Sequence, residues 1–393
     1  MNAGIQPVLP RFNGACLSNL LPAIVASLDR PGDEPEWLPA PVRDATQVVV
    51  LVLDGLGYEQ LASRRSIAPT ISSGTGGPVT TVAPSTTACA LTSLVTGLPP
   101  AVHGMVGYRV HVDGDVFNIL KWRIGPRDAR ETIRAREFQR YVSFPRTPGA
   151  TPEIRTPGGS GGERADLVPV VTRNDYRPTG FTAAHLAEAK LYGWQTAAEI
   201  PVEVSALLND GHQLVYAYYD GIDRVSHARG LDQHFDAELR FADRLVADML
   251  SELPKGSVLV VTADHGQVDV GPSVEVLGPD VMDGVTLLTG EGRFRWLHTL
   301  PGAEEDVASA ARETYGNIAW VWTRDELVEE GILGGEPVPE VMARLGDVVL
   351  APFSDTAFFD PADVGEQRLV GRHGSLTAAE MLVPLLAWSA PGT

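Results

Sequence analysis

The stretch Val48-Val49-Val50-Leu51-Val52-Leu53-Asp54-Gly55 decides the fold. Its unbroken run of valine and leucine is typical of a strand that is covered on both faces, as strands are in parallel sheets. The run stops at Asp54, and ligands of doubly wound sheets bind where the strands end. We therefore expect Asp54 to lie at the edge of the sheet that carries the chemistry. An aspartate that forms a turn before glycine explains the same residue equally well from local sequence alone.

Two later stretches repeat this arrangement. The apolar run Leu214–Tyr219 leads into Asp220–His227, and Val258–Thr262 leads into Ala263-Asp264-His265-Gly266. Between them, apolar residues at helical spacing predict a long amphipathic helix from Phe235 to Leu253. This alternation predicts an α/β fold, with a mainly parallel sheet flanked by helices on both faces.

The chain is interpreted as a single catalytic domain over residues 1–393 with two insertions that cap the site and set specificity. Residues 105–180 form the first insertion. Within it, 143–164 is rich in Pro, Gly and Thr and has no apolar period, which predicts a mobile loop. Residues 273–350 form the second insertion, an inserted cap subdomain.

The composition limits the partners. The formal net charge of −19 disfavours binding to a nucleic-acid polymer or to an anionic membrane, because both would repel the protein. A small anionic substrate fits only if metal ions invert the local charge. Cys16 and Cys89 are too few for a disulfide framework, and no apolar run is long enough to cross a bilayer. These features predict a cytoplasmic protein and leave its oligomeric state undetermined.

A hydroxyl-rich segment, Thr80–Leu98, enters a short run of small residues that reads as a helix. The first turn of a helix attracts phosphate oxygens through its free N–H groups and its positive dipole end. A hydroxyl at that position can attack phosphorus if its proton is removed. The alternative is a Ser or Thr cap in front of a buried helix, which is the commoner use of these residues.

Carboxylate and imidazole side chains near the strand ends suit zinc or a similar divalent ion. The candidates are Asp54, Asp223, His227, Asp264, His265 and His373. Asp223 and His227 are one helical turn apart and therefore face the same side. We expect two ions a few ångströms apart. Asp223, His227 and His373 would hold one ion, and Asp54, Asp264, His265 and a hydroxyl the other. Taken singly, each histidine is better explained as an ordinary surface or core residue.

Six motifs of this chain occur in the same order along the sequence as the motifs of a known family. They are Val52–Gly55, Pro84–Leu98, Val102–Gly104, Asp223–His227, Thr262–Gly266 and Arg372–Gly374. In these motifs the chain resembles the alkaline phosphatase superfamily, most closely its nucleotide pyrophosphatase/phosphodiesterase branch. The resemblance implies two zinc ions, with manganese as the alternative, and a phosphothreonine intermediate that water hydrolyses. It places the nucleophile, which is also a metal ligand, on Thr87, with Thr86 and Ser85 as neighbouring alternatives.

The sequence departs from that family near the nucleophile. Three residues after Thr87, where the resemblance leads us to expect an Asn that binds a phosphate oxygen, the chain has Ala90. Asn118, in the adjacent insertion, is the candidate to bind the substrate in its place. The residue after Thr87 is Ala88 instead of a bulky aromatic, so nucleobase stacking does not carry over from the resemblance.

Together these observations predict a metal-dependent phosphoesterase that hydrolyses a phosphodiester or a nucleotide pyrophosphate. A phosphomonoesterase and a phosphonate hydrolase are alternatives at the same site. A non-catalytic binding protein on this scaffold is the alternative from another class.

Overall fold

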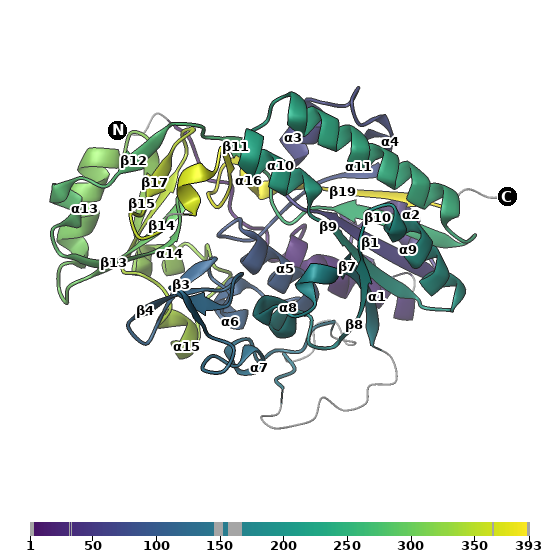
Figure 1. The fold of residues 1–393 in the computed structure, drawn as a ribbon, viewed down its shortest axis with the longest axis horizontal. Coiled ribbons are helices and arrows are strands. Elements are labelled where there is room, and N and C mark those ends of the chain that lie inside the picture. Colours follow the sequence, from purple (N-terminus) through teal and green to yellow (C-terminus); the bar gives the residue numbers. More distant parts are fainter. Residues whose placement is uncertain are drawn as a thin grey trace.

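The computed structural model describes residues 4–30, 32, 34–144, 152–155, 167–363 and 365–390 (Figure 1). Most of the predicted mobile loop at 143–164 lies outside these residues. In the described part, no helix has the length and apolar character that crossing a membrane requires.

A seven-stranded sheet forms the centre of the fold, in the order β2-β19-β10-β1-β9-β7-β8. Its strands are β1 (Gln47–Leu53), β2 (Thr75–Thr80), β7 (Val168–Arg173), β8 (Ala189–Trp194), β9 (Leu214–Tyr219), β10 (Ser257–Thr262) and β19 (Leu382–Ser389). The neighbours from β10 to β8 pair in parallel, whereas β19 is antiparallel to both β10 and β2. This confirms the predicted mainly parallel sheet.

The strand β1 lies in the middle because its side chains are apolar on both faces. Val48 to Leu53 are all fully buried, and burying each such side chain contributes roughly 1.5–3 kcal/mol. β1 pairs in register with β10 and with β9, so that Val52 lies opposite both Thr262 and Tyr218. The three strands therefore end at the same edge of the sheet.

Two separate groups of helices cover the sheet, as the sequence predicted. On one side, α9 (Glu199–Asn209) packs on β7, β8 and β9, and α11 (Gln233–Glu252) packs on α9. On the other, α2 (Ala40–Arg43) packs on β2, β10 and β19 and against α1 (Leu20–Asp29). The buried stripe of α11 is the apolar series expected from the sequence, from Phe235 to Met249.

The remaining helices are mostly short. They are α3 (Tyr58–Ala62), α4 (Pro69–Ser72), α5 (Thr87–Thr96), α6 (Pro100–His103), α7 (Ala135–Phe138), α8 (Gly180–His185), α10 (Gly221–Arg229), α12 (Pro279–Met282), α13 (Glu304–Tyr315), α14 (Arg324–Glu329), α15 (Pro339–Met342) and α16 (Ala378–Met381), with 3-10 turns η1 (Leu17–Asn19), η2 (Asn174–Tyr176) and η3 (Glu366–Arg368).

A second sheet lies at the opposite end of the molecule from α9 and α11 (Figure 1). It has the order β13-β14-β16-β15. Its strands are β13 (Val285–Glu291), β14 (Phe294–Thr299), β15 (Ala319–Thr323) and β16 (Val348–Pro352). With α13 it encloses its own apolar cluster, centred on Leu297, Val307 and Leu350. Its strands fall almost entirely within the predicted insertion at 273–350, and its role as a cap stays a prediction.

Three small sheets complete the structure. One is a four-stranded meander of β3 (Arg109–Val112), β4 (Asp115–Asn118), β5 (Arg123–Ile124) and β6 (Arg127–Asp128). The others are the pairs of β11 (Val268–Asp269) with β18 (Gly371–Arg372), and of β12 (Val274–Val276) with β17 (Ala357–Phe359). The meander lies inside the predicted insertion at 105–180. The strand β7, in the same range, belongs to the central sheet instead, because its apolar residues pair with β9.

Candidate metal centre

Two carboxylates leave the sheet side by side. Asp54 follows β1 and Asp264 follows β10, and these two strands pair directly. The backbone N–H of Gly55 donates a hydrogen bond to Oδ1 of Asp264 over 3.1 Å. Gly55 has a φ of +77°, and a Cβ built on it would lie 3.0 Å from Cα of Asp223. A glycine is therefore required here, both for the backbone conformation and for the close approach of the segment that carries Asp223.

Asp54, Asp264 and His265 form what we call the inner group. Nε2 of His265 lies 3.5 Å from Oδ1 of Asp54 and 3.4 Å from Oδ2 of Asp264. Its Nδ1 is engaged by the carbonyl of Gly266 at 3.1 Å, which turns Nε2 toward the two carboxylates. These three side chains are close enough to one another to share a metal ion.

Asp223, His227 and His373 form what we call the outer group. Oδ1 of Asp223 lies 3.3 Å from Nε2 of His227 and 3.8 Å from Nε2 of His373. Nδ1 of His227 contacts the carbonyl of Gly371 at 2.8 Å, and Nδ1 of His373 contacts that of Ser85 at 2.9 Å. Both rings therefore present Nε2 to the same carboxylate, as histidine ligands do when their other nitrogen is held.

The two groups adjoin each other. The rings of His265 and His373 are stacked with centroids 3.5 Å apart, and Asp223 lies within metal-sharing reach of both. His227 is more peripheral, with its ring centroid 5.2 Å from that of His373. The structure thus brings together all six ligands predicted from the sequence.

The inner group fits a cation. Oδ1 of Asp54 and Oδ2 of Asp264 are buried and have no hydrogen-bond partner among the described residues. Leaving such a charged oxygen unpaired costs several kcal/mol, and a divalent ion coordinated by both would remove that cost. The donor set of two carboxylates and one imidazole suits zinc and similar ions.

The electrostatics of the two groups also favours a bound metal ion. Burial, followed by the charges of Asp264 and Asp223, raises the pKa of Asp54 well above its usual value. Burial, followed by repulsion from His265 and His227, lowers the pKa of His373 well below its usual value. The protein alone thus disfavours both the ionised aspartate and the protonated histidine. A bound dication favours carboxylate and neutral imidazole, which are the forms that coordinate metal.

Thr87 is the hydroxyl that meets these ligands. It is the first residue of α5, and its Oγ1 lies 3.1 Å from Nε2 of His265. The two neighbouring alternatives point elsewhere. Thr86 is buried and its side chain lies near Glu291, while Oγ of Ser85 donates to the carbonyl of Ser375 over 2.7 Å. Of the three hydroxyls, only Thr87 is both half-buried and directed at the inner group.

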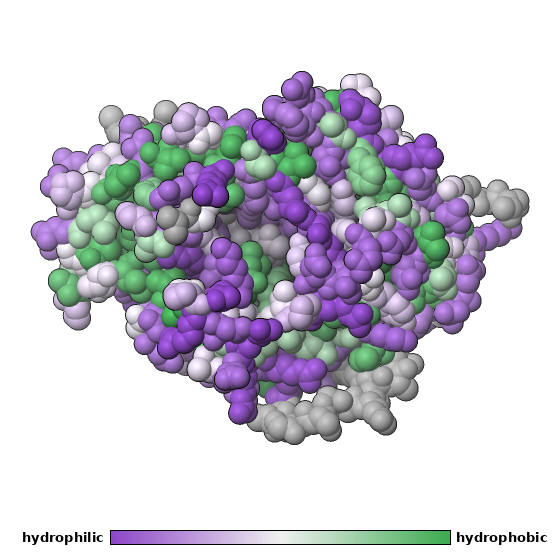
Figure 2. All heavy atoms as spheres, in the orientation of Figure 1, coloured by the Kyte–Doolittle hydropathy of each residue, from purple (hydrophilic) through white to green (hydrophobic). Residues whose placement is uncertain are grey.

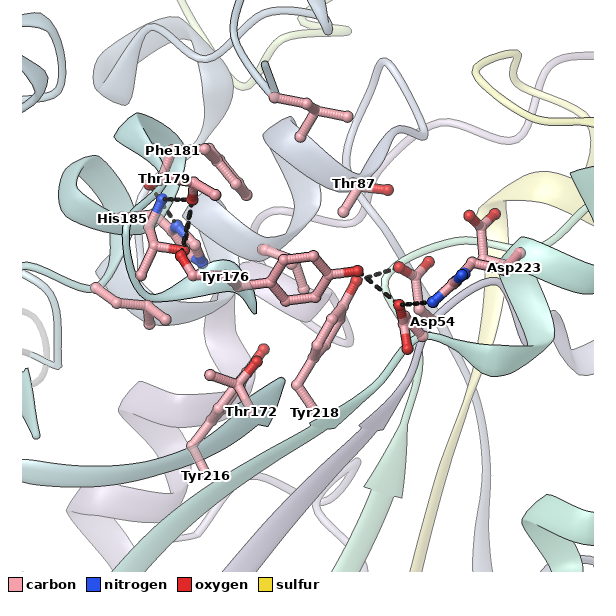
Figure 3. Close-up of a pocket in the computed structure, with 16 residues that line it drawn as sticks. Asp54, Thr87, Thr172, Tyr176, Thr179, Phe181, His185, Tyr216, Tyr218 and Asp223 are labelled. Carbon is pink, nitrogen blue, oxygen red and sulfur yellow. Dashed lines mark hydrogen bonds and ion pairs between the residues drawn. The ribbon is translucent and has the colours of Figure 1, made fainter. Parts of the chain in front are cut away.

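Two cavities open on Thr87. The first, which we call the aromatic cavity, has a volume of about 290 Å³ and is walled by residues such as Tyr176, Phe181 and Tyr218 (Figure 3). The second, which we call the polar cavity, has a volume of about 320 Å³. Thr87, Leu120 and Asp223 line both cavities. Figure 2 shows a hollow in this face of the molecule, in the region where Figure 1 places α5.

Sequence reasoning missed the residues that support the ligands. The hydroxyl of Tyr218 donates to Oδ2 of Asp54, and Nε2 of Gln267 donates to Oδ1 of Asp223 over 2.5 Å. Tyr176 donates similarly to Asp220 over 2.6 Å. Figure 3 shows Tyr218 extending toward Asp54 from β9. One signal in the sequence could have found Tyr218. Side chains alternate between the two faces of a strand, so Tyr216 and Tyr218 of β9 lie on the same face of the sheet.

The structure also places the two other residues singled out near the nucleophile. Ala90 lies in α5, three residues after Thr87, and is fully buried. Asn118 does line the polar cavity together with Thr87, and its Oδ1 accepts a hydrogen bond from the backbone of Lys121 over 2.9 Å.

Comparisons with known proteins agree with this geometry. The family model of type I phosphodiesterases / nucleotide pyrophosphatases matches residues 48–376. No curated protein matches the chain. Among solved structures, murine ectonucleotide pyrophosphatase/phosphodiesterase 5 has a TM-score of 0.63 at 16% sequence identity, covering 87% of this chain and 88% of its own.

Two further structures are similar to the same extent. An inactive threonine-to-alanine variant of the murine protein, in complex with AMP, has a TM-score of 0.61 at 16% identity and 87% coverage of both chains. The human counterpart has a TM-score of 0.62 at 15% identity and 87% coverage of both chains. At these identities the likeness establishes the alkaline-phosphatase-like fold.

Proposed function

Because this chain belongs to the type I phosphodiesterase/nucleotide pyrophosphatase family, we propose that it cleaves phosphodiesters or nucleotide pyrophosphates through a phosphothreonine on Thr87. It is a hydrolase of phosphoric ester or pyrophosphate bonds, in a metal-dependent family. The observation that carries the proposal is the position of Oγ1 of Thr87, 3.1 Å from Nε2 of His265, at the junction of two cavities.

Two divalent ions, zinc by the chemistry of the donors, would be held by the inner and outer groups. When bound, they supply positive charge that lowers the pKa of the Thr87 hydroxyl and neutralises the phosphate. The unpaired oxygens of Asp54 and Asp264 support this assignment. Manganese is the alternative for the same donors.

In the first step, Oγ1 of Thr87 loses its proton to solvent and attacks phosphorus, and the bond to the leaving oxygen breaks. The leaving group takes up a proton from water, and the phosphothreonine that remains still carries the other substituent of phosphorus. In the second step, water attacks phosphorus and loses a proton to solvent, the bond between phosphorus and Oγ1 of Thr87 breaks, and Oγ1 takes up a proton. The N-terminal turn of α5 orients free backbone N–H groups toward the phosphate oxygens throughout. The inactivity of the threonine-to-alanine variant of the murine protein is consistent with such a nucleophile.

The two cavities favour a diester over a monoester. A monoester carries one substituent on phosphorus and would leave one of the cavities at Thr87 without a ligand group. A diester or pyrophosphate carries a substituent on each side of the scissile bond. A phosphonate hydrolase remains the second alternative, since the attacking group would be the same.

The test compares bis-p-nitrophenyl phosphate with p-nitrophenyl phosphate, using zinc-loaded and chelated protein. We expect the diester to be cleaved at least about tenfold faster, and chelation to abolish turnover. With the diester as substrate, acid quenching followed by mass spectrometry should find a p-nitrophenyl phosphoryl group on the peptide that contains Thr87. Faster cleavage of the monoester would favour a phosphomonoesterase. No turnover of either compound with zinc or manganese restored would favour a binding protein.

A further inference from the structure

The polar cavity has a wall of charged residues that the proposed reaction does not use. Thr87, Asp223, His227 and His373 line it on the side of the candidate metal centre. A second set of residues, Lys121, Glu291, Arg293, Asp363, Glu366 and Arg372, lines it as well. Most of these are buried, although none of them is a metal ligand in the proposed reaction. A buried polar wall is costly to build without a ligand to satisfy it.

The acidic groups of this wall have arginine neighbours, although Oδ2 of Asp363 and Oε1 of Glu291 have no hydrogen-bond partner among the described residues. Glu366 pairs with Arg295 at 2.6 Å, and Asp363 lies 3.4 Å from Nη1 of Arg109. Both arginines lie behind the wall and do not line the cavity. Burial, followed by the charge of Glu366, raises the pKa of Glu291 to about 8, so that this carboxyl is mostly uncharged at neutral pH.

Two of the basic groups also keep a donor without a partner. Arg293 is fully paired with Glu380 at 2.7 Å. Nη1 of Arg372, however, is buried and has no hydrogen-bond partner, with its nearest carboxylate, that of Glu366, at 3.5 Å. The ammonium of Lys121 makes neither an ion pair nor a hydrogen bond with any residue that the structure describes. Two donors thus remain for an anion in a cavity that adjoins the nucleophile.

We propose that the polar cavity is the subsite for the leaving group, and that Lys121 and Arg372 select a leaving group that carries phosphate, such as pyrophosphate or a nucleotide. This inference rests on the proposed function, because it requires a bond to be cleaved at Thr87. The aromatic cavity, which Thr87 also lines, takes the half of the substrate that stays on the enzyme. The carboxyl of Glu291 in its neutral form does not repel the leaving phosphate.

The test uses two substrates that share the thymidine 5′-phosphoryl half and differ in the leaving group. Thymidine triphosphate leaves pyrophosphate, whereas thymidine 5′-monophosphate p-nitrophenyl ester leaves an aromatic alcohol without phosphate. For the variant Lys121→Ala, we expect kcat/KM for the triphosphate to fall about tenfold, which is the loss of one charged contact. The value for the nitrophenyl ester should change less than twofold. Lys121 is exposed, so the substitution leaves the fold intact.

The matched control is Lys255→Ala, which removes another exposed lysine, one outside both cavities. It should leave both substrates unaffected. Arg372→Lys, which keeps the charge but removes the fork of donors, should impair the triphosphate more than the ester as well.

Equal effects of Lys121→Ala on both substrates would overturn the inference, as would a wild-type enzyme that cleaves the ester but not the triphosphate. In both outcomes the proposed function stands. If the wild-type enzyme cleaves neither substrate, the proposed function fails and the inference fails with it.

Discussion

The inner and outer ligand groups have similar chemistry but differ in burial. In the inner group the side chains of Asp54, Asp264 and His265 are at most 4% exposed. In the outer group the exposed fractions are 13% for Asp223, 24% for His227 and 10% for His373. Asp223 lines both cavities, and His227 and His373 line the polar one, whereas Asp54 is the only inner ligand that lines either.

The difference follows from the elements that carry the ligands. The inner group extends from the ends of β1 and β10, whose ladder of backbone hydrogen bonds holds Asp54 and Asp264 in place. The outer group joins α10 to the segment after β18, two elements outside the central sheet. Its position depends on contacts such as that between His227 and the carbonyl of Gly371. We infer that the inner group is the rigid part of the centre and the outer group the part that meets the substrate.

The largest effect should come from the nucleophile, next to the inner group. Thr87→Ala should lower kcat/KM for bis-p-nitrophenyl phosphate by at least about 10³-fold, because the attacking oxygen is lost. Thr86→Val removes the neighbouring hydroxyl, which lies near Glu291, and should keep kcat/KM within about tenfold of the wild-type value. The reverse ranking would assign the nucleophile to Thr86.

Replacing one ligand from each group tests directly whether the two groups differ in burial. Asp264→Asn and Asp223→Asn should each reduce the bound metal from two ions to one, measured by elemental analysis. In chelated protein, however, Asp264→Asn should raise the melting temperature by about 2 °C or more. The substitution removes a fully buried carboxylate whose Oδ2 has no hydrogen-bond partner, whereas Asp223 is partly solvated. Equal melting temperatures for the two chelated variants would contradict the contrast in burial.

The support of the inner group should have an intermediate effect. Tyr218→Phe removes the hydroxyl that donates to Oδ2 of Asp54. We expect the metal affinity to fall about 10- to 100-fold, as is usual when a partner of a metal ligand is lost. Competition with a fluorescent chelator measures this change. Tyr176→Phe is the control, since its hydroxyl bonds to Asp220, which is not a predicted ligand.

The last prediction concerns the stability of the fold and not activity or metal binding, at Glu291 in the polar cavity. Its pKa is raised to about 8 in the folded state from an ordinary value of 4.5. Between these values the folded state binds one more proton than the unfolded state, so stability decreases as the pH rises. Glu291→Gln removes this ionisation, and should make the protein more stable than wild type by a margin that grows from pH 5 to pH 8.

Urea unfolding at several pH values measures that margin, which we expect to be on the order of a few kcal/mol at pH 8. A margin that is constant over this range would show that the carboxyl is ionised in the folded protein.

Much of the centre was predictable, because its ligands follow buried strands or lie at helical spacing. Asp54 and Asp264 end apolar runs that only a parallel sheet buries on both faces, and Asp223 and His227 are spaced by one helical turn. His373 was a candidate by its residue type, and the resemblance supported it through the motif Arg372–Gly374, since a lone histidine in a loop has no local signal of its own. The roles of Tyr218 and Gln267 were not predictable, because they depend on the register between β9 and β1 and on the path of the chain after β10.

The sequence by itself determined the parallel sheet, the identity of the candidate ligands and the family to which they point, because apolar runs and motif spacing are local properties. Only the tertiary structure decided which hydroxyl meets the ligands and that Thr87 lines two cavities. Those facts depend on how segments far apart in the chain pack against each other. Packing of that kind leaves no periodic trace in the sequence.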